Sequence, residues 1–360
     1  MEERVETSAT SNSESDSDTA SSSSRKSNAA SAKPGALGLD IGTSRIVAAN
    51  STYDQETRSQ LNAFIAMPAS EMAENVLKQR NIVYERNCES LYVYGNDTDF
   101  FASFLDTEMR RPMQYGLLNA KEQMSQHIIQ MIVKRLVPQS RKSDVLCFSV
   151  PGRGDTVEGN LVYHEAVLKS FLQSQGYQAK PLNEGMAVVY SELKNENFTG
   201  IGISCGGGMC NVAVSFMAMP VITFSVPRGG DYIDTNVAAV LNETPSRVRL
   251  FKEEKLDLLS PSDDDLSRAL NIYYEDVLQA LLDRLRMEFR AQSQLPRIDR
   301  PMPIVVAGGT AMPEGFLKKF ESMLHSGGDF PIQLADVRLA KDPLTATARG
   351  CYIAAMSEIK

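Results

Sequence analysis

The chain has 360 residues, of which 42% are hydrophobic and 23% charged, and this composition fits a globular protein of one large domain or two ordinary ones. A net charge of −8 argues against general binding to nucleic acid or to anionic membranes. No apolar run reaches the ~20 residues of a membrane span, and the acidic, serine-rich start is not that of a signal peptide.

The cysteines and histidines indicate no metal centre. The three histidines form no motif, and the five cysteines are scattered without metal-ligand spacing, at Cys88, Cys147, Cys205, Cys210 and Cys351. We therefore expect reduced, structural thiols in a cytoplasmic protein.

Residues 1–34 form a polar tract without an aromatic side chain. Such a tract cannot bury enough apolar surface to offset its ordering entropy, so we expect a disordered, serine-rich acidic tail. An alternative is a regulatory or partner-binding arm, since serines flanked by acidic residues are plausible phosphorylation sites.

Residues 35–195 alternate strands and helices. The pattern predicts two apolar strands over 37–49 around a polar-glycine turn, a helix near 69–80 and a strand over 90–96. An amphipathic helix is expected over 120–136, a buried strand over 144–152, a helix at about 161–175, and a strand end leading into a helix over 179–193. The apolar stretch 61–68 is interpreted as a buried strand, so membrane contact is unsupported.

Residues 196–360 repeat this order. A strand, a glycine turn and two further strands are expected over 198–226, followed by helical stretches at about 231–258 and 264–292. A strand, a Gly-Gly turn and a helix follow over 303–324, and a small-residue helix closes the chain.

A hairpin with a polar or glycine-rich tip thus occurs near 37–49 and again near 200–214. Repetition of the same pattern predicts two similar α/β domains, 35–195 and 196–360, that face each other across a cleft. The second would carry a helical insertion at about 235–300, and the last helix would return towards the first domain. The N–H groups of the two hairpin tips would suit a polyphosphate in the cleft.

Five segments in this order resemble the superfamily of actin, heat-shock-chaperone and sugar-kinase ATPases over about residues 36–358. They are "LDIGTS" (39–44), "PLNEGMAVVY" (181–190), "CGGGMCNVAV" (205–214), "IVVAGGTAMPEGF" (304–316) and "ATARGCYIAA" (346–355). Segments 111–136 and 226–238 are most similar to bacterial actin-like proteins of the MreB type. The resemblance implies an actin-like ATPase fold, with two RNase H-like domains around a nucleotide cleft, and ATP with Mg²⁺ as its ligands.

The same resemblance implies roles for individual residues. Asp40 would hold Mg²⁺, usually through water, and Glu184 would position the attacking water. The phosphates would be bound by the two loops, at Gly42, Thr43, Ser44, Gly206, Gly207 and Gly208. The rest of the nucleotide cleft would be lined by Gly229, Gly230, Asp231, Gly308, Gly309 and Thr310.

Adenine and ribose contacts would come from the run "FKEEKL". The interpretation preferred here takes Glu254 and Lys255, and the alternative register takes Lys252 and Glu253. Each assignment has a structural alternative: Asp40 or Asp231 could cap a turn or helix, Glu184 could be an acid favoured by the helix dipole, and the charged run could be a solvated face.

The second loop departs from the pattern of the superfamily. The expected aspartate falls at Ser204, the threonine after the glycines at Met209, and the later acidic position at Asn211. Loss of one electrostatic contributor often costs a factor of ~10²–10³ in rate. We therefore expect nucleotide binding to survive better than hydrolysis.

The resulting hypothesis is an MreB-type, nucleotide-binding protein that self-associates into filaments in cell shape or intracellular organisation, with weak or slow ATP hydrolysis. The alternative is a non-hydrolysing scaffold, similar to PilM or FtsA, that docks a protein partner of the envelope or cytoskeleton. A sugar kinase ranks lowest, because no residue suggests itself as a substrate base.

Overall fold

The computed structural model describes residues 35–50, 57–105, 107–138, 140, 144–154, 158–260, 264–292, 300–326, 328, 330 and 332–359. All of them belong to one of the two units into which the chain divides, residues 34–360. The predicted tail over 1–34 lies outside the described residues.

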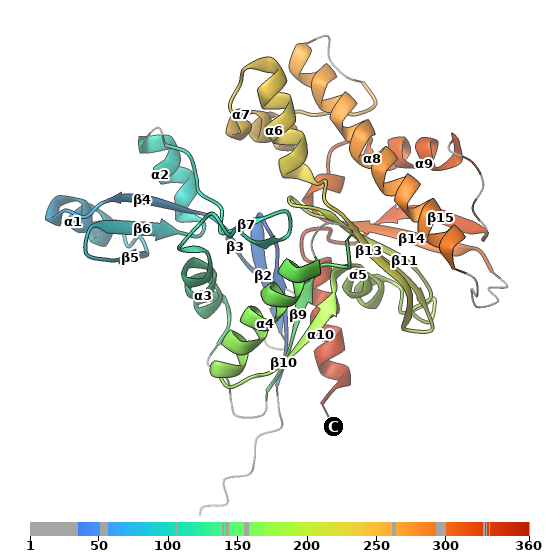
Figure 1. Ribbon diagram of the computed structural model, residues 1–360, viewed down its shortest axis with the longest axis horizontal. Coiled ribbons are helices and arrows are strands. Elements are labelled where there is room, and N and C mark those ends of the chain that lie inside the picture. Colours follow the sequence, from blue (N-terminus) through green and yellow to red (C-terminus); the bar gives the residue numbers. More distant parts are fainter. Residues whose placement is uncertain are drawn as a thin grey trace, which may run out of the picture. The chain divides into compact units, whose positions relative to one another are not determined.

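Two five-stranded sheets carry the fold, and they share one topology (Figure 1). In each, three antiparallel strands that follow one another in sequence are extended on one side by two parallel strands. The first sheet has the order β10 (Gln178–Asn183), β9 (Val145–Val150), β1 (Ala36–Ile41), β2 (Arg45–Asn50), β3 (Arg58–Leu61). The second has the order β13 (Met219–Val226), β12 (Cys210–Phe216), β11 (Gly200–Cys205), β14 (Met302–Ala307), β15 (Leu334–Leu339). The predicted α/β fold with two similar halves is therefore confirmed.

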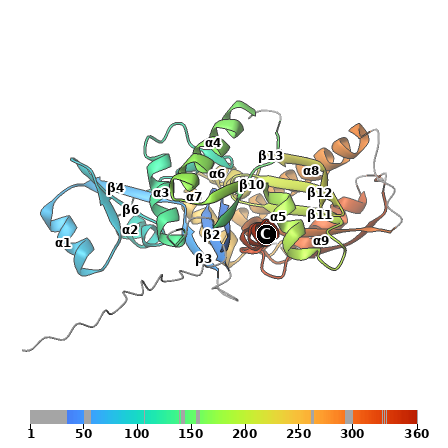
Figure 2. The ribbon, with the colours of Figure 1, turned by 90° about the horizontal axis from the view of Figure 1, so that it is seen from below.

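Two helices, α5 (Glu184–Glu192) and α10 (Ala346–Ser357), lie between the sheets (Figures 1 and 2). Helix α10 packs on β1, β2 and β9, α5 packs on β11, β12 and β14, and the two helices pack on each other. Their contact is close, because a Cβ atom built on Gly350 would overlap the carbonyl oxygen of Ala187. A glycine at position 350 is therefore required for the two helices, and with them the two sheets, to lie this close together.

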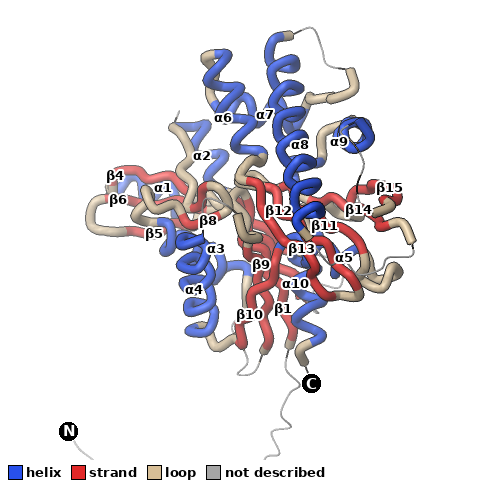
Figure 3. Tube along the Cα trace, turned by 45° about the vertical axis from the view of Figure 1, so that its right-hand side comes forward, coloured by secondary structure: helices blue, strands red, loops and turns tan. Residues whose placement is uncertain are grey.

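Each half carries smaller elements outside its sheet (Figure 3). In the first half these are four helices, a three-stranded sheet of order β4-β6-β5 and a short hairpin of β7 and β8. The helices are α1 (Glu71–Gln79), α2 (Asp97–Leu105), α3 (Ser125–Leu136) and α4 (Glu158–Ser174). The strands are β4 (Phe64–Pro68), β5 (Tyr84–Arg86), β6 (Ser90–Tyr94), β7 (Met113–Gln114) and β8 (Leu117–Leu118). In the second half they are α6 (Gly230–Leu241), α7 (Pro245–Glu254), α8 (Asp265–Ala291), the 3₁₀ turn η1 (Gly309–Ala311) and α9 (Phe316–Ser326).

The helical stretch expected over 231–258 is two helices. Asn242 ends α6 in the left-handed region with φ 54°, a conformation that stops a helix. Thr244 then accepts a hydrogen bond from the Arg247 N–H, and Pro245 occupies the first turn of α7. The amphipathic helix expected from residue 120 likewise begins later, at Ser125.

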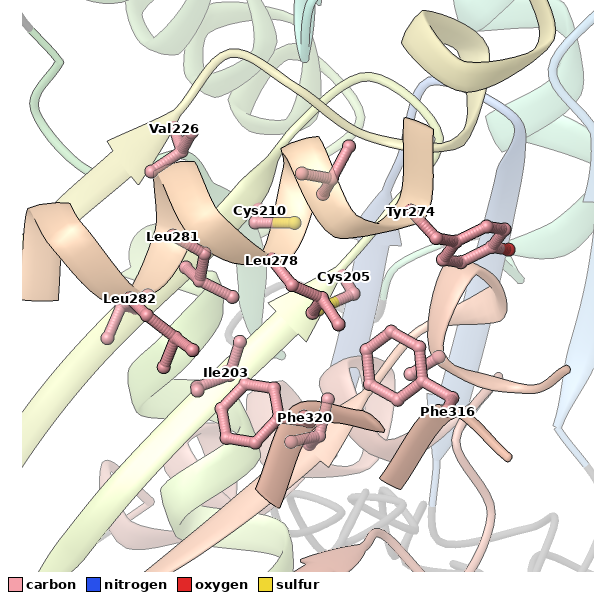
Figure 4. Packing of buried hydrophobic residues seen from close by; sticks show 14 of the residues in the cluster. Ile203, Cys205, Cys210, Val226, Tyr274, Leu278, Leu281, Leu282, Phe316 and Phe320 are labelled. Atoms are coloured by element: carbon pink, nitrogen blue, oxygen red, sulfur yellow. The ribbon is translucent and has the colours of Figure 1, made fainter. Parts of the chain in front are cut away.

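Buried side chains of both halves form separate cores on their sheets. In the second half, leucine side chains of α8 pack against β11 and β12, next to Cys205 and Cys210 (Figure 4). All five cysteines are free, and four of them are buried.

The α5–α10 contact predicts a large effect of adding one methyl group. Gly350→Ala would force the backbones of α5 and α10 apart, so we expect a loss of roughly 2–4 kcal/mol in the free energy of unfolding, measured by urea denaturation. Ile353→Ala, on the exposed side of the same helix, should cost well below half as much. Equal effects of the two variants would contradict the close packing.

Candidate functional site

A cavity of about 580 Å³ opens between the two hairpin tips, β1–β2 and β11–β12. Residues from α5, α6, α7, α8, η1 and the loop before α10 also line it. All but one of the residues selected from the sequence line it, namely Asp40, Gly42, Thr43, Ser44, Glu184, Gly206, Gly207, Gly208, Gly230, Asp231, Glu254, Lys255, Gly308, Gly309 and Thr310, and so do the alternatives Lys252 and Glu253. Positions far apart in the sequence thus meet at one cavity.

The two hairpin tips touch each other. A Cβ atom on Gly207 would overlap the hydroxyl of Ser44, and one on Gly208 would overlap that of Thr43. The Thr43 hydroxyl also accepts a hydrogen bond of 3.1 Å from the Gly116 N–H. The glycines of the second loop are therefore required by the close approach of the first hairpin.

The glycine loop is supported from behind by the start of α6. The N–H groups of Gly230 and Asp231 donate to the carbonyls of Gly206 and Gly207 over 3.1 and 2.8 Å. The Thr310 hydroxyl donates to the Gly206 carbonyl over 2.8 Å. Gly229 packs behind this loop, where a Cβ atom would lie 2.5 Å from both carbonyl oxygens, and it is the one selected residue that does not line the cavity.

Two carboxyl groups lie at the floor of the cavity, where Asp40 is half-buried and Glu184 is buried. Asp40 ends β1 and accepts a hydrogen bond of 2.7 Å from the Ser149 hydroxyl. Glu184 opens α5, which is capped by Asn183. Burial raises the pKa of Asp40 to about 6. Burial, and then the nearby charge of Asp40, raises the pKa of Glu184 to about 8. Without a cation, Glu184 is mostly protonated at neutral pH.

The three positions at which the second loop departs from the superfamily have defined contacts. Ser204 donates a hydrogen bond of 3.0 Å to Glu184 Oε2. Asn211 Oδ1 accepts hydrogen bonds from the Gly152 N–H and the Ser225 hydroxyl over 3.0 and 2.6 Å, which ties the loop after β9 to the second sheet. Met209 is buried against Gly116.

The part of the cavity that α6 and α7 line is polar. Lys252 Nζ forms a buried ion pair of 2.6 Å with Asp234 and donates to the Gly230 carbonyl over 3.1 Å. Burial raises the pKa of Asp234 to about 6, although the Lys252 ammonium opposes this rise. Arg249, one helical turn before Lys252, pairs with Asp99 of α2 over 3.2 Å, across the cleft.

Sequence reasoning missed Asp234, Arg249 and Tyr274, which also line the cavity. Asp234 had a signal, since it ends the acidic repeat of the segment "GGDYID". Arg249 had one as well, because it lies three residues before Lys252 on the same helix. Tyr274 lies in the middle of α8, and only the packing of α8 brings it here.

The described residues offer no group of three or more His, Cys, Asp or Glu side chains for a metal ion. A single half-buried carboxylate such as Asp40 still fits Mg²⁺, which commonly takes one or two carboxylates together with water and phosphate oxygens. Within the same residues, no helix has the length and apolar character to cross a membrane.

These halves, joined by two helices beneath a cleft with paired hairpin tips, define the actin-like ATPase fold. Solved structures share it: the MamK double helical filament has a TM-score of 0.68 at 20% identity, covering 90% of this chain and 99% of that one. MreB 5 of Spiroplasma citri bound to AMPPNP has a TM-score of 0.60 at 14% identity, with 90% and 96% covered. The ethanolamine utilization protein EutJ from Carboxydothermus hydrogenoformans has a TM-score of 0.50 at 16% identity, with 89% and 90% covered.

The family model Volactin matches residues 36–355, and the chain belongs to the Volactin family. A comparison with curated proteins gave no match. The predicted resemblance to actin-like ATPases is thereby confirmed, whereas the assigned roles of individual residues stay predictions.

The buried Glu184 predicts a pH-dependent stability in the absence of nucleotide and divalent cations. Because its folded pKa lies above the ordinary value of 4.5, its stabilising contribution is complete below that value and is lost as pH rises through about 8. Glu184→Gln keeps an acceptor for Ser204 and removes this loss. The free energy of unfolding of Glu184→Gln, minus that of wild type, should grow by roughly 1–3 kcal/mol between pH 5 and pH 8.5 in urea titrations.

The pH-dependent loss of the wild type includes Asp40 and Asp234, whose folded pKa values are also raised. These groups are present in both proteins, so most of their contribution cancels in the difference. A difference that stays constant with pH would show that Glu184 titrates normally.

Proposed function

We propose that this protein binds ATP with Mg²⁺ in the cavity between its hairpin tips and assembles into filaments, with slow hydrolysis at most. The observation that carries the proposal is the convergence of both glycine-containing tips, Asp40 and Glu184 on one cavity. The actin-like relatives support it, since MreB 5 was solved with AMPPNP and MamK as a double helical filament.

The end of the cavity at the tips suits a polyphosphate. Gly42, Thr43 and Ser44 line it from the first hairpin, and the glycines of the second loop add no side chains of their own. Asp40 would hold Mg²⁺, and the bound ion would neutralise charge on the phosphates. The raised pKa of Asp40 agrees with this role, because a buried carboxylate gains most from a nearby cation.

Slow hydrolysis follows from the contacts of Glu184. A protonated carboxyl group is a poor acceptor for the hydrogen of an attacking water, and one oxygen of Glu184 is already occupied by Ser204. No carboxylate at position 204 shares the cation with Asp40. The same observation favours a second candidate, a non-hydrolysing scaffold that uses bound nucleotide only for stability and docks an envelope or cytoskeletal partner.

Thermal unfolding and sedimentation test the binding and the assembly. ATP with Mg²⁺ at ~100 times the dissociation constant should stabilise the protein by roughly 2.7 kcal/mol, and the protein should pellet in a nucleotide-dependent manner. Asp40→Asn keeps the shape of the side chain and accepts a hydrogen bond from Ser149, but it should lose most of the Mg²⁺-dependent part of the stabilisation. Absence of any shift with millimolar MgATP would overturn the nucleotide proposal, and binding without pelleting would favour the scaffold.

Ser204→Asp tests why hydrolysis is slow. The new carboxylate would lie against Glu184, so the variant should be less stable than wild type without divalent cations and should recover stability with MgATP. Phosphate release should rise above the wild-type rate, and a further Glu184→Ala change should abolish the gain. A wild type that already hydrolyses ATP briskly, and that Ser204→Asp slows, would refute this account. Met209 is left unchanged, because its side chain fills the space beside Gly116.

A further inference from the structure

Two cysteines face each other across the second hairpin, at the base of its glycine loop. Cys205 ends β11 and Cys210 begins β12, and the two are partners in the register of these strands. The Gly206 N–H donates to the Met209 carbonyl over 3.0 Å and closes the turn. Because hydrogen-bonded and non-hydrogen-bonded pairs alternate along an antiparallel ladder, Cys205 and Cys210 form a non-hydrogen-bonded pair. Side chains approach each other most closely in such pairs, with Cα atoms about 4.5 Å apart.

Both thiols point into the core of the second half. They are buried under α8, beside Leu278 (Figure 4). The hydrogen bond between the two thiols, and then burial, raises the pKa of Cys205 well above its usual range. The two sulfur atoms are therefore neighbours, and the Cys205 thiol is protonated at neutral pH.

This arrangement fits a disulfide. A disulfide needs Cα atoms about 4.4–6.8 Å apart and Cβ atoms that face each other, and a non-hydrogen-bonded pair meets both conditions. The ring that it would close contains the three glycines of the loop, whose backbone adapts most easily to a small ring. Cys147 and Cys351 share another buried cluster, but the first lies on β9 and the second on α10, so they are not strand partners.

We propose that Cys205 and Cys210 form a reversible disulfide that locks the base of the glycine loop when the protein meets a low-molecular-weight disulfide oxidant. One cysteine thiolate attacks the oxidant, whose S–S bond breaks, and a mixed disulfide forms as the first small thiol leaves. The other cysteine thiolate then attacks the protein-bound sulfur and releases the second small thiol. The protein gives up two electrons and two protons to the oxidant, and a reducing dithiol reverses the reaction.

Burial makes local opening a part of this reaction. A buried, protonated thiol is inert, so the hairpin must separate transiently from α8 before the oxidant can reach a sulfur atom. Once formed, the link holds the ends of β11 and β12 together through later openings. The lock is independent of the proposed nucleotide binding, which can fail without affecting it.

Oxidised glutathione tests the pair in the full chain. The reduced protein is incubated with it in native buffer, alkylated with iodoacetamide and digested with trypsin. Trypsin releases residues 195–228 as one fragment that contains Cys205 and Cys210 and no other cysteine. Mass spectrometry should find this fragment lighter by two hydrogen atoms than its reduced form, without alkyl or glutathione groups. Dithiothreitol added before alkylation should restore both thiols.

Cys210→Ala and Cys351→Ala are matched variants, because each removes a fully buried thiol. After oxidation, the wild type and Cys351→Ala should melt about 2–4 °C higher than in the reduced state, since a cross-link restricts the unfolded chain. Cys210→Ala should show no such rise. The fragment analysis of the wild type needs neither variant to fold.

Three results would contradict the proposal. Alkylation of both cysteines in the 195–228 fragment, or glutathione retained there without ring closure, would overturn the disulfide. A link between Cys147 and Cys351 that forms as fast would show that shared burial, and not strand register, decides the pairing. A melting temperature of the wild type that falls on oxidation would overturn the lock.

Discussion

The crossing of α5 and α10 is the constraint on which the cleft depends. Gly350 lies against the Ala187 carbonyl, Gly38 of β1 lies against the Ala348 carbonyl, and Gly202 of β11 lies against the Gly185 carbonyl, with no room for a side chain at any of the three. Backbone therefore meets backbone from one sheet through two helices to the other. A spacer of this kind fixes the separation of the sheets, and with it the distance between the two hairpin tips.

Within the part of the chain that the structure describes, polar contacts also join the two halves across the cleft. Asn211 joins the second sheet to the loop after β9, and Arg249 joins α7 to Asp99 of α2. The first contact is buried and the second is partly solvent-exposed, so the second contributes about 1 kcal/mol at most. Ser225 of β13 adds hydrogen bonds of 2.9 and 3.1 Å to the carbonyls of Gly152 and Arg153 in the same loop. The two halves are thus joined by packed helices at the base and by polar contacts across the cleft, and a ligand that contacts both tips would add to them.

The sequence was informative wherever local chemistry decides the structure. The two hairpins, the glycine loops and the helix after the strand end near Glu184 follow from turn residues and hydrophobic periodicity. The actin-like order of segments came from the resemblance to a known superfamily. Other features depend on packing between distant segments, and no local pattern shows them. Gly229 faces the back of the loop because α6 donates to that loop, and Tyr274 reaches the cavity because of the rotation of α8. The break between α6 and α7 did have a local signal, Asn242 before Thr244 and Pro245, which the helical pattern on either side obscured.

On the proposed function, the floor of the cavity accounts for nucleotide binding with little hydrolysis. Asp40 and Glu184 lie close together in a poorly solvated place, and the charge of Asp40 disfavours the ionised form of Glu184. On the proposed function, a divalent cation would relieve this repulsion chiefly at Asp40. Glu184 gains less, because Ser204 already holds one of its oxygens and position 204 offers no second charge to draw the cation closer. Binding of a cation and a polyphosphate therefore does not require Glu184 to ionise. Positioning an attacking water for hydrolysis does require it. On the proposed function, Ser204 at the end of β11, in place of an aspartate, leaves the affinity for nucleotide in place and limits the rate of hydrolysis.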